Sequence, residues 1–407
     1  MFNLLQHAGW EVPLALLLLA LLTLRARVKP TASLLVKTSP ARIWELIKPY
    51  DGKVDLFGRV KMTTRLLDVA SQIYEVTWAA AMPNGTSRPF VAMFRVAECE
   101  PERKLVLMRT GLEGKSERNE LLEISYELVA EPKGTRLKTK YVWGSRALLA
   151  QLLARADLWG GAYRMKALAE TGKPSEKAHR LISAGVAIVT GIFTVLAFGL
   201  SLGMPVALVL VFALLVHEFG HLLAFRLIGQ PWGRIVFLPF LGAIAVPRMH
   251  YETQAQSVFA ALMGPGFSCL LLILCTLAIA IHAPLPTLFM IIGVVTAGLN
   301  LFNLLPTEPL DGGVALRSVL TKLIGPRAPL ALMALGLVLV GVGLYIQQLS
   351  LVIFGGFAVL GNLKARKIDV GLIPLTSLQV SIFFFGYVVI FFAHYTMLFQ
   401  FLDQMKL

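Results

Sequence analysis

Long apolar runs after residue 180 constrain this chain more than any other feature of its sequence. About 20 consecutive apolar residues are enough for a helix to cross the hydrocarbon layer of a bilayer. The runs lie at 181–201, 204–228, 254–282, 286–305, 328–346, 349–363 and 377–401. With a further run at 12–24, and with 349–363 the shortest after residue 180, the sequence predicts a polytopic α-helical membrane protein of about eight spans.

Charged residues divide the chain into two parts of different composition. Of the 38 Lys and Arg residues, 28 lie between Arg25 and Arg180, together with 17 of the 24 acidic residues. Only 15% of the whole chain is charged and 56% is hydrophobic, whereas an ordinary soluble domain is about 25% charged. A charged, soluble domain is therefore expected at 31–175, between an anchor helix at 1–28 and an apolar membrane part.

Basic residues also predict the orientation in the membrane. If "RARVK", which ends the anchor, lies in the cytoplasm, nine of the ten basic residues after residue 180 fall on the cytoplasmic side as well, and only Lys406 does not. The net charge of +14 is explained by this rule, so no nucleic-acid partner is expected. The expected location is a bacterial inner (plasma) membrane, with the soluble domain and the active-site face cytoplasmic.

The soluble segment is typical of an α+β fold. "SPARIWELI" predicts a helix that begins with Ser39 as its cap and Pro40 at its first position. "LLEISYELV" and "TRLKTKYVW" alternate apolar and polar residues as strands do, and so do "QIYEVTWAA", "RPFVAMFRVAE" and "KLVLMRT". "ALLAQLLARADLWGGAYRMKALAE" then predicts a long closing helix laid across an antiparallel sheet.

This order of elements resembles the START-like or polyketide-cyclase-like lipid-binding superfamily, which has a helix-grip fold. The resemblance covers about 140 residues and rests on the opening "SPARIWELI" and the closing "LWGGAYRMKALAE". It implies a hydrophobic ligand or lipid between the sheet and the long helix. Domains of this kind also serve as plain interaction modules, and the sequence leaves both roles open.

"LLVHEFGHLLA", residues 214–224, places three ionisable residues in an apolar run. Residues four apart share one face of a helix, so His217 and His221 can direct their ring nitrogens at one point. In the HExxH pattern the two histidines bind zinc, and the glutamate, here Glu218, takes a proton from water. The alternative is two histidines that merely bond neighbouring helices, but a carboxylate in lipid is costly and favours a functional site.

A catalytic zinc ion needs a third protein ligand and an open position. Acidic or imidazole residues after residue 180 with plausible reach are Glu252, Glu308, Asp311, His250, His282 and His394. The predicted topology excludes His282, which falls on the opposite side of the membrane. Asp311 follows two prolines and precedes two glycines, where the chain leaves a helix. Asp311 is therefore the predicted third ligand.

Both motifs together resemble the site-2 proteases, which are intramembrane zinc metalloproteases. The family's second motif, N-x-x-P-x-x-P-L-D-G, stands at 303–312, and the resemblance spans roughly 181–325, followed by additional helices at 326–407. It implies hydrolysis of peptide bonds inside the bilayer, in transmembrane protein substrates. It also implies that His217, His221 and Asp311 hold Zn²⁺, that Glu218 is the general base, and that Asn303 helps to stabilise the oxyanion.

Three segments near the motifs add detail. Thr307 and Glu308 stand where the family usually has apolar residues, and Glu308 either tunes the site or faces water. "MGPGFS", 263–268, resembles the family's Gly-Pro helix entry, with Ser268 where Asn is common. "FLPFLGAIAVPR", 237–248, predicts a short re-entrant, strand-like segment whose edge can pair with an unwound substrate.

Two other classes of function remain open from the sequence. One is a polytopic transporter that relays metal ions or protons, although such proteins usually show internal repeats and no second copy of either motif is found. The other is a membrane protein that binds lipids without proteolysis. "ETGKPSEKAHR", 170–180, predicts a short polar connection, so the soluble domain is expected either to gate the active site or to act as a passive anchor.

Overall fold

The computed structural model describes residues 29–57, 60–80, 90–110, 121–143, 148–173, 175, 177–230, 232–239, 242–248, 251–307, 309–347, 349–363 and 372–405. The chain forms two compact units, Met1–Thr190 and Gly191–Leu407. Each unit is described below by itself. The expected anchor at 1–28 lies outside the described residues.

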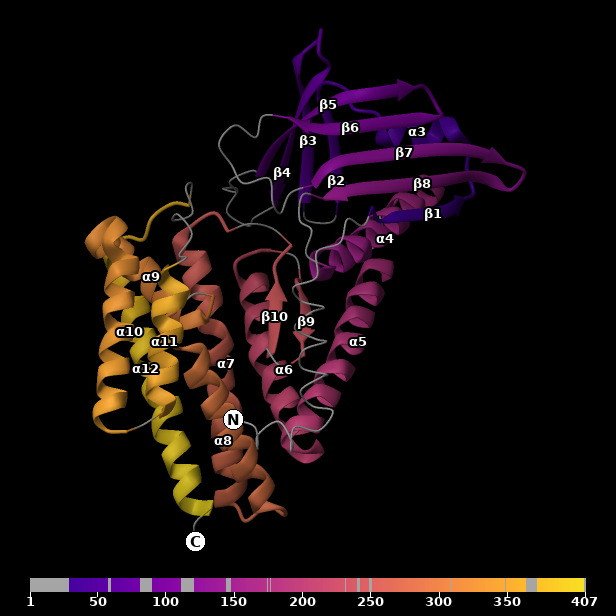
Figure 1. Cartoon of the computed structure of the whole chain (residues 1–407). Helices are drawn as coiled ribbons and strands as arrows, with labels where there is room; N and C mark the ends of the chain where they lie inside the picture. Colours follow the sequence, from indigo (N-terminus) through magenta and orange to yellow (C-terminus); the bar gives the residue numbers. More distant parts are fainter. Residues whose placement is uncertain are drawn as a thin grey trace, which may run out of the picture. The chain divides into compact units, whose positions relative to one another are not determined.

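The first unit is built on an eight-stranded antiparallel sheet (Figure 1). Its strands are β1 Thr31–Val36, β2 Lys53–Phe57, β3 Val60–Asp68, β4 Ile73–Ala80, β5 Phe90–Glu100, β6 Lys104–Thr110, β7 Leu121–Glu131 and β8 Gly134–Trp143. The spatial order is β1-β8-β7-β6-β5-β4-β3-β2, so the first strand pairs with the last. The strands expected from the alternating patterns are thereby confirmed.

Two helices complete this unit as the sequence predicted. Helix α3, Pro40–Ile47, begins after Ser39, whose side chain accepts a hydrogen bond from the Arg42 N–H at 3.4 Å. Helix α4, Leu148–Thr171, contacts β1 and β8. Both helices contribute to one buried apolar cluster with the sheet, made of Val36, Ile43, Trp44, Ile47, Leu105, Leu128, Leu137 and Ala169. This is the helix-grip arrangement of the expected fold class.

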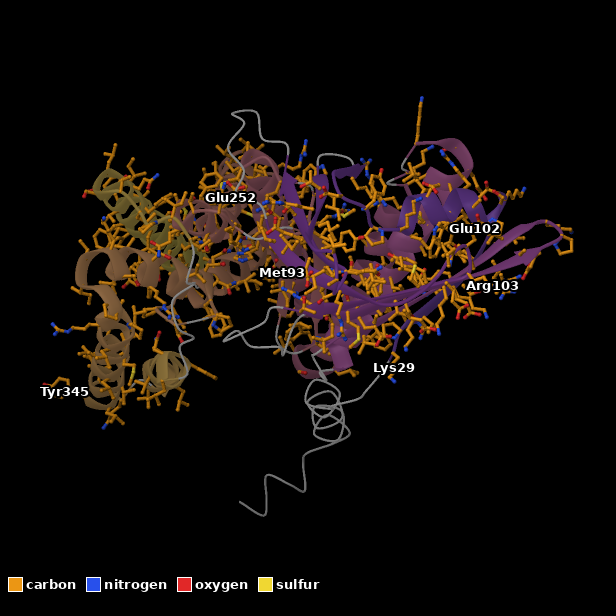
Figure 2. The ribbon with its side chains drawn as sticks, turned by 90° about the horizontal axis from the view of Figure 1, so that it is seen from above. Lys29, Met93, Glu102, Arg103, Glu252 and Tyr345 are labelled. Atoms are coloured by element: carbon orange, nitrogen blue, oxygen red, sulfur yellow. The ribbon has the colours of Figure 1, made fainter. Side chains whose placement is uncertain are left out.

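The two faces of the sheet differ in polarity, as strand alternation requires. Leu137 is fully buried against the helices, whereas Lys138 reaches the carboxylate of Glu127 on the neighbouring strand at 3.1 Å. The turn between β5 and β6 projects Glu102 and Arg103 (Figure 2), and Glu102 adopts a left-handed φ of 58° there. Charged pairs thus line the side that the helices leave uncovered.

The connection after α4 is shorter than the sequence predicted. Helix α4 continues through Thr171, and helix α5, Lys177–Leu202, begins soon after it. Only residues 172–176 separate the two helices, because most of the polar segment 170–180 is itself helical. The polar composition therefore predicted a connection at 170–180 that is longer than the observed one at 172–176.

Helices dominate the remainder of the chain. They are α5 Lys177–Leu202, α6 Met204–Leu227, α7 Gln254–Ala280, α8 Pro286–Asn303, α9 Asp311–Ile324, α10 Ala328–Tyr345, α11 Leu349–Leu363 and α12 Ser377–Met405. Among the described residues, six helices are long and apolar enough to cross a membrane, and α9 and α10 count as one continuous helix, Asp311–Tyr345. The chain is thus an integral membrane protein.

Eight spans are not confirmed. Helix α11 has 15 residues and packs closely against α10, but it is shorter than a full span requires. The run at 12–24 lies outside the described residues.

Tyr345, at the end of α10, is 88% exposed (Figure 2) and ends that helix with an amphipathic side chain.

Helix α7 is the centre of the membrane part, since it packs against α6, α8, α9 and α12. Its cap is Thr253, whose side chain accepts a hydrogen bond from the Gln256 N–H at 3.0 Å. The family resemblance suggested that the "MGPGFS" segment begins a helix. The structure shows that it does not. It lies inside α7, where Pro265 is accommodated within the helix.

A β-hairpin packs beside α6, where the sequence predicted a strand-like segment. Its strands, β9 Arg234–Leu238 and β10 Gly242–Val246, are antiparallel. Phe237 of β9 joins Val211 and Leu214 of α6 in one buried cluster. The hairpin therefore has a fixed position relative to the helix that bears the HExxH motif.

Candidate metal centre

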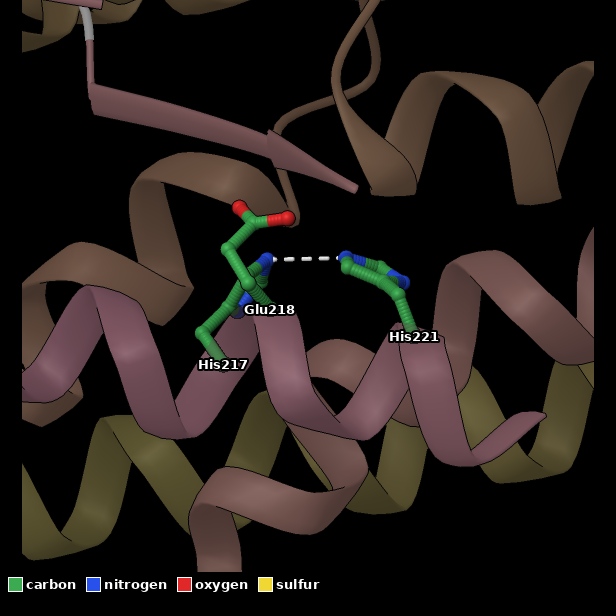
Figure 3. A group of neighbouring side chains, drawn as sticks. All are labelled: His217, Glu218 and His221. Atoms are coloured by element: carbon green, nitrogen blue, oxygen red, sulfur yellow. Dashed lines mark hydrogen bonds between the residues drawn. The ribbon is translucent and has the colours of Figure 1, made fainter. Parts of the chain in front are cut away.

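Helix α6 carries three buried ionisable side chains, His217, Glu218 and His221 (Figure 3). They form one potential metal-binding group, in which one ligand atom from each residue lies within 4.8 Å of the others. The imidazole rings meet edge to face, with centroids 4.8 Å apart. The i, i+4 spacing thus places both rings at one point, as predicted.

Asp311, the predicted third ligand, reaches the same point from a different helix. Its Oδ2 lies 3.1 Å from Nε2 of His217 and 3.4 Å from Nε2 of His221. The two Nε2 atoms are 3.0 Å apart. Asp311 is the first residue of α9, so the turn after α8 delivers its carboxylate to the histidines.

Hydrogen bonds at the other ring nitrogens determine which nitrogen faces this point. Nδ1 of His221 lies 2.7 Å from the carbonyl oxygen of Ala260, which can only accept a hydrogen bond. Nδ1 of His217 lies 2.7 Å from Oδ1 of Asn300, whose amide nitrogen donates to the carbonyl of Thr296. Both Nδ1 atoms therefore donate, and a neutral ring then presents an unprotonated Nε2.

Three acceptor atoms facing one another repel unless a proton or a metal cation lies between them. A tetrahedral zinc ion with nitrogen and oxygen ligands at about 2.0–2.2 Å separates its ligand atoms by roughly 3.3–3.5 Å. The observed separations of 3.0, 3.1 and 3.4 Å are close to that spacing. Two imidazoles held by outer hydrogen bonds plus one carboxylate also match the donor set of a catalytic zinc site. The residues fit a zinc ion.

Glycines allow the helices around the centre to approach closely. A Cβ on Gly264 of α7 would overlap Nε2 of His221 and would lie 2.9 Å from Cε1 of His217. A Cβ on Gly220 of α6 would lie 3.0 Å from Cα of Gly264. A Cβ on Gly312 would overlap the backbone of Leu304. Larger residues at these positions would displace the ligands.

Glu218 is placed beside the three ligand atoms, and part of its carboxylate is left open. Its side chain is 3% exposed and interacts with the backbone of Ala245 in β10. Its Oε2 is buried and has no hydrogen-bond partner among the described residues. A buried carboxylate oxygen normally has a partner, so this atom is suited to bind a water molecule or a reacting group.

Other residues singled out from the sequence are placed as follows. Asn303 is the last residue of α8 and is half-buried. His394 is fully buried and donates from Nε2 to the carbonyl of Pro265 at 2.9 Å, so it is hydrogen-bonded rather than a ligand. Glu308 and His250 lie outside the described residues.

Asn300 was not predicted, although it is fully buried and bonds directly to His217. Its signal in the sequence was a second amide in an apolar run, one helical turn before Asn303. Gly264 was also missed, because its role appears only when α6 and α7 are packed together. Both residues support the ligands from helices that do not carry them.

Comparisons with known proteins give partial matches to the chain. No family model matches the chain. A protein of Synechocystis sp. named "Putative zinc metalloprotease sll0528" is 32% identical over 128 residues, which are 30% of this chain and 33% of that protein. The chain thus spans about a third of the length of that relative. The sequence similarity confirms the resemblance to zinc metalloproteases.

Two solved structures are similar to parts of the chain. One is a site-2 protease from Methanocaldococcus jannaschii, which is 24% identical, with 46% of this chain and 92% of that chain covered and a TM-score of 0.31. Another is an AHSA1-like protein from Aeromonas hydrophila, which is 13% identical, with 39% and 94% covered and a TM-score of 0.25.

The close approach at Gly264 predicts a specific loss of metal. In Gly264→Ala the added methyl group must displace the rings of His217 and His221, so zinc affinity should fall by about tenfold or more, as for damaged supporting shells of metal sites. Chelator competition on the purified protein measures it. Gly298→Ala is the control, because a Cβ there meets nothing within 4 Å. Equal zinc affinity in the two variants would contradict the proposed packing.

Proposed function

We propose that this chain is an intramembrane zinc metalloprotease of the site-2 type, which hydrolyses peptide bonds within or near transmembrane segments of membrane proteins. The observation that carries the proposal is the convergence of two imidazole nitrogens and one carboxylate oxygen within 3.4 Å, among apolar helices. Similarity to a zinc metalloprotease supports the same class. The substrates are transmembrane proteins that we expect to unwind at the cleavage position.

In this proposal His217, His221 and Asp311 hold the zinc ion. When bound, the ion supplies a Lewis acid that polarises the peptide carbonyl and makes water more acidic. Asn300 and the Ala260 carbonyl hold the rings in the tautomer that leaves Nε2 available. Three protein ligands are the number with which catalytic zinc sites hold their ion.

Glu218 acts as general base and then as general acid. Its Oε2 takes a proton from the attacking water and returns it to the nitrogen of the departing amine. Burial of Glu218 beside the three ligand atoms supports this role, as does the absence of a partner for Oε2 among the described residues. Asn303 is proposed, on the family resemblance, to donate a hydrogen bond to the oxyanion.

The hairpin next to Glu218 supports a mode of substrate binding. Ala245 of β10 interacts with the catalytic carboxylate, and β10 pairs with β9 along one side. An extended peptide can add to the other side of a strand through backbone hydrogen bonds. A substrate bound in this way would be extended beside the metal, as hydrolysis of its backbone requires.

Replacement of Glu218 by Gln tests the mechanism. Glu218→Gln should retain about one zinc per chain, because the glutamate is not a ligand, but it should lose cleavage by a factor of about 10² or more, the usual contribution of general acid–base catalysis. Metal content by elemental analysis and cleavage of single-span substrates in proteoliposomes measure both effects.

His217→Ala combined with His221→Ala is the complementary variant, and it should lose both metal and cleavage. Undiminished cleavage by Glu218→Gln would contradict the proposed base. Undiminished zinc in the double variant would contradict the proposed site.

We further propose that the START-like domain regulates proteolysis through an apolar ligand between its sheet and α4. Burial raises the pKa of Tyr141 to about 12, and burial also raises the pKa of Tyr126. Both tyrosines lie on the apolar face of the sheet, and Tyr141 packs against Leu158 and Ala162 of α4. The region between the sheet and α4 is buried and lined by apolar side chains, which favours an apolar ligand over a charged one.

A bulky residue on this inner face should change cleavage if a ligand governs access. Ile124 pairs with Tyr141 across β7 and β8, so Ile124→Trp narrows the interior, whereas the adjacent Ser125→Trp alters the opposite face. We expect a severalfold change in cleavage rate for Ile124→Trp alone, with zinc content unchanged. Equal rates in the two variants and the unaltered protein would favour the passive anchor.

The proposed location is a bacterial inner membrane, with the START-like domain and the metal-site face in the cytoplasm. A single cysteine at Lys115, in a protein whose three cysteines are replaced by serine, should be protected from an impermeant thiol reagent in intact cells. Labelling should appear after permeabilisation. Labelling in intact cells would reverse the proposed orientation.

A further inference from the structure

The last two described helices lie beyond the segment that resembles the proteases, yet they contact the loop that delivers Asp311. This loop runs between the end of α8 at Asn303 and the start of α9 at Asp311. Helix α12 packs against α7, α8 and α9. From α12, Tyr387 donates a hydrogen bond to the carbonyl of Leu304 at 2.6 Å.

Helix α11 holds the next part of the same loop. The side-chain nitrogen of Asn362 donates to the carbonyl of Pro306 at 3.1 Å, and Asn362 is 2% exposed. In the opposite direction, the hydroxyl of Thr307 donates to the carbonyl of Phe357 in α11 at 3.1 Å. Leu304, Pro306 and Thr307 are thus each tied to a helix outside the loop.

These hydrogen bonds provide partners for backbone carbonyls that are buried among apolar helices. The last carbonyls of a helix have no partner within the helix, and an unpaired backbone group is unfavourable in an apolar environment. Pro306 and Pro309 cannot donate backbone hydrogen bonds. Side chains from α11 and α12 therefore supply the donors for the buried carbonyls of Leu304 and Pro306.

The position of Leu304 is coupled to that of the metal ligand. Gly312 follows Asp311 directly, and a Cβ on Gly312 would overlap the Leu304 backbone. Leu304 is fully buried in a cluster that Tyr387 also packs against. A shift of the Leu304 backbone would therefore move the first turn of α9, and with it the Asp311 carboxylate.

We propose that Tyr387 and Asn362 are positioning residues for the Asp311 ligand, so that α11 and α12 are part of the metal centre. The inference rests on the proposed function, because it assumes that Asp311 binds the metal. The two side chains touch neither metal nor substrate. They act through the carbonyls of Leu304 and Pro306, which hold the loop against α9.

Two separate substitutions in the full-length protein test the inference. Tyr387→Phe removes one hydroxyl and keeps the ring, and Asn362→Leu removes the donor at similar volume. Tyr395→Phe is the matched control, because Tyr395 lies on the same helix, is 45% exposed and stacks with Phe391. Zinc affinity is measured by chelator competition, and the ligand field by the absorption spectrum of the cobalt-substituted protein.

We expect each test variant to bind zinc at least about tenfold more weakly, as for damaged supporting shells of metal sites. The cobalt spectrum should shift, and backbone amides at 304–312 should exchange faster with deuterium. Tyr395→Phe should match the unaltered protein in all three measurements. A merely structural role would lower thermal stability and leave zinc affinity and the cobalt spectrum unchanged.

Unchanged zinc affinity and cobalt spectrum in whichever variants fold would overturn the inference while leaving the protease proposal intact. If instead the unaltered protein binds no zinc at His217, His221 and Asp311, the proposed function fails first. The two failures are therefore distinguished by the unaltered protein alone.

Discussion

Mutual repulsion among three acceptor atoms is the constraint on which the membrane part depends. Nε2 of His217, Nε2 of His221 and Oδ2 of Asp311 lie within 3.4 Å of one another in a buried site. Without a metal cation or a shared proton this arrangement places lone pairs against lone pairs, in a buried site where charges are weakly screened. Hydrogen bonds to Asn300 and to the Ala260 carbonyl orient the two imidazole rings. Glycines leave space for the rings, and the turn after α8 places the Asp311 carboxylate beside them. The repulsion among the three acceptor atoms is the unfavourable term that metal binding offsets.

The apolar surroundings explain why residues on several helices, including α11 and α12, hold the loop that carries Asp311 in place. In water, a loop such as 304–310 could satisfy its carbonyls with solvent. Among apolar helices its partners must be protein groups, and they come from α11 and α12. His394 of α12 plays the same part for the Pro265 carbonyl in α7, one residue from Gly264. Helix α12 thus contacts both the ligand loop and the helix that packs on the histidines.

Features that depend on local spacing could be predicted from the sequence. The i, i+4 spacing of His217 and His221 implies a shared point on any helix, and strands β4 to β8 of the first unit follow from alternation, whereas β1, β2 and β3 were not predicted. Asp311 required the topology of two spans, and basic residues supplied it. Asn300 and Gly264 could not be found in this way, because their roles arise from packing between helices distant in sequence. The connection after Thr171 was misjudged because polar residues can extend a helix as readily as end it.

The two amides of α8 suggest how one helix serves two steps. Asn300 bonds to His217 and is therefore committed to orienting a ligand. Asn303 lies three residues later, about 4.5 Å further along the helix axis and next to the loop that carries Asp311. In the proposed mechanism the Asn303 amide donates to a reacting group, since no ring nitrogen among the described residues is hydrogen-bonded to it. The family resemblance assigns the oxyanion to Asn303, so the proposed mechanism uses two amides of one helix, Asn300 to orient a ligand and Asn303 to stabilise the oxyanion.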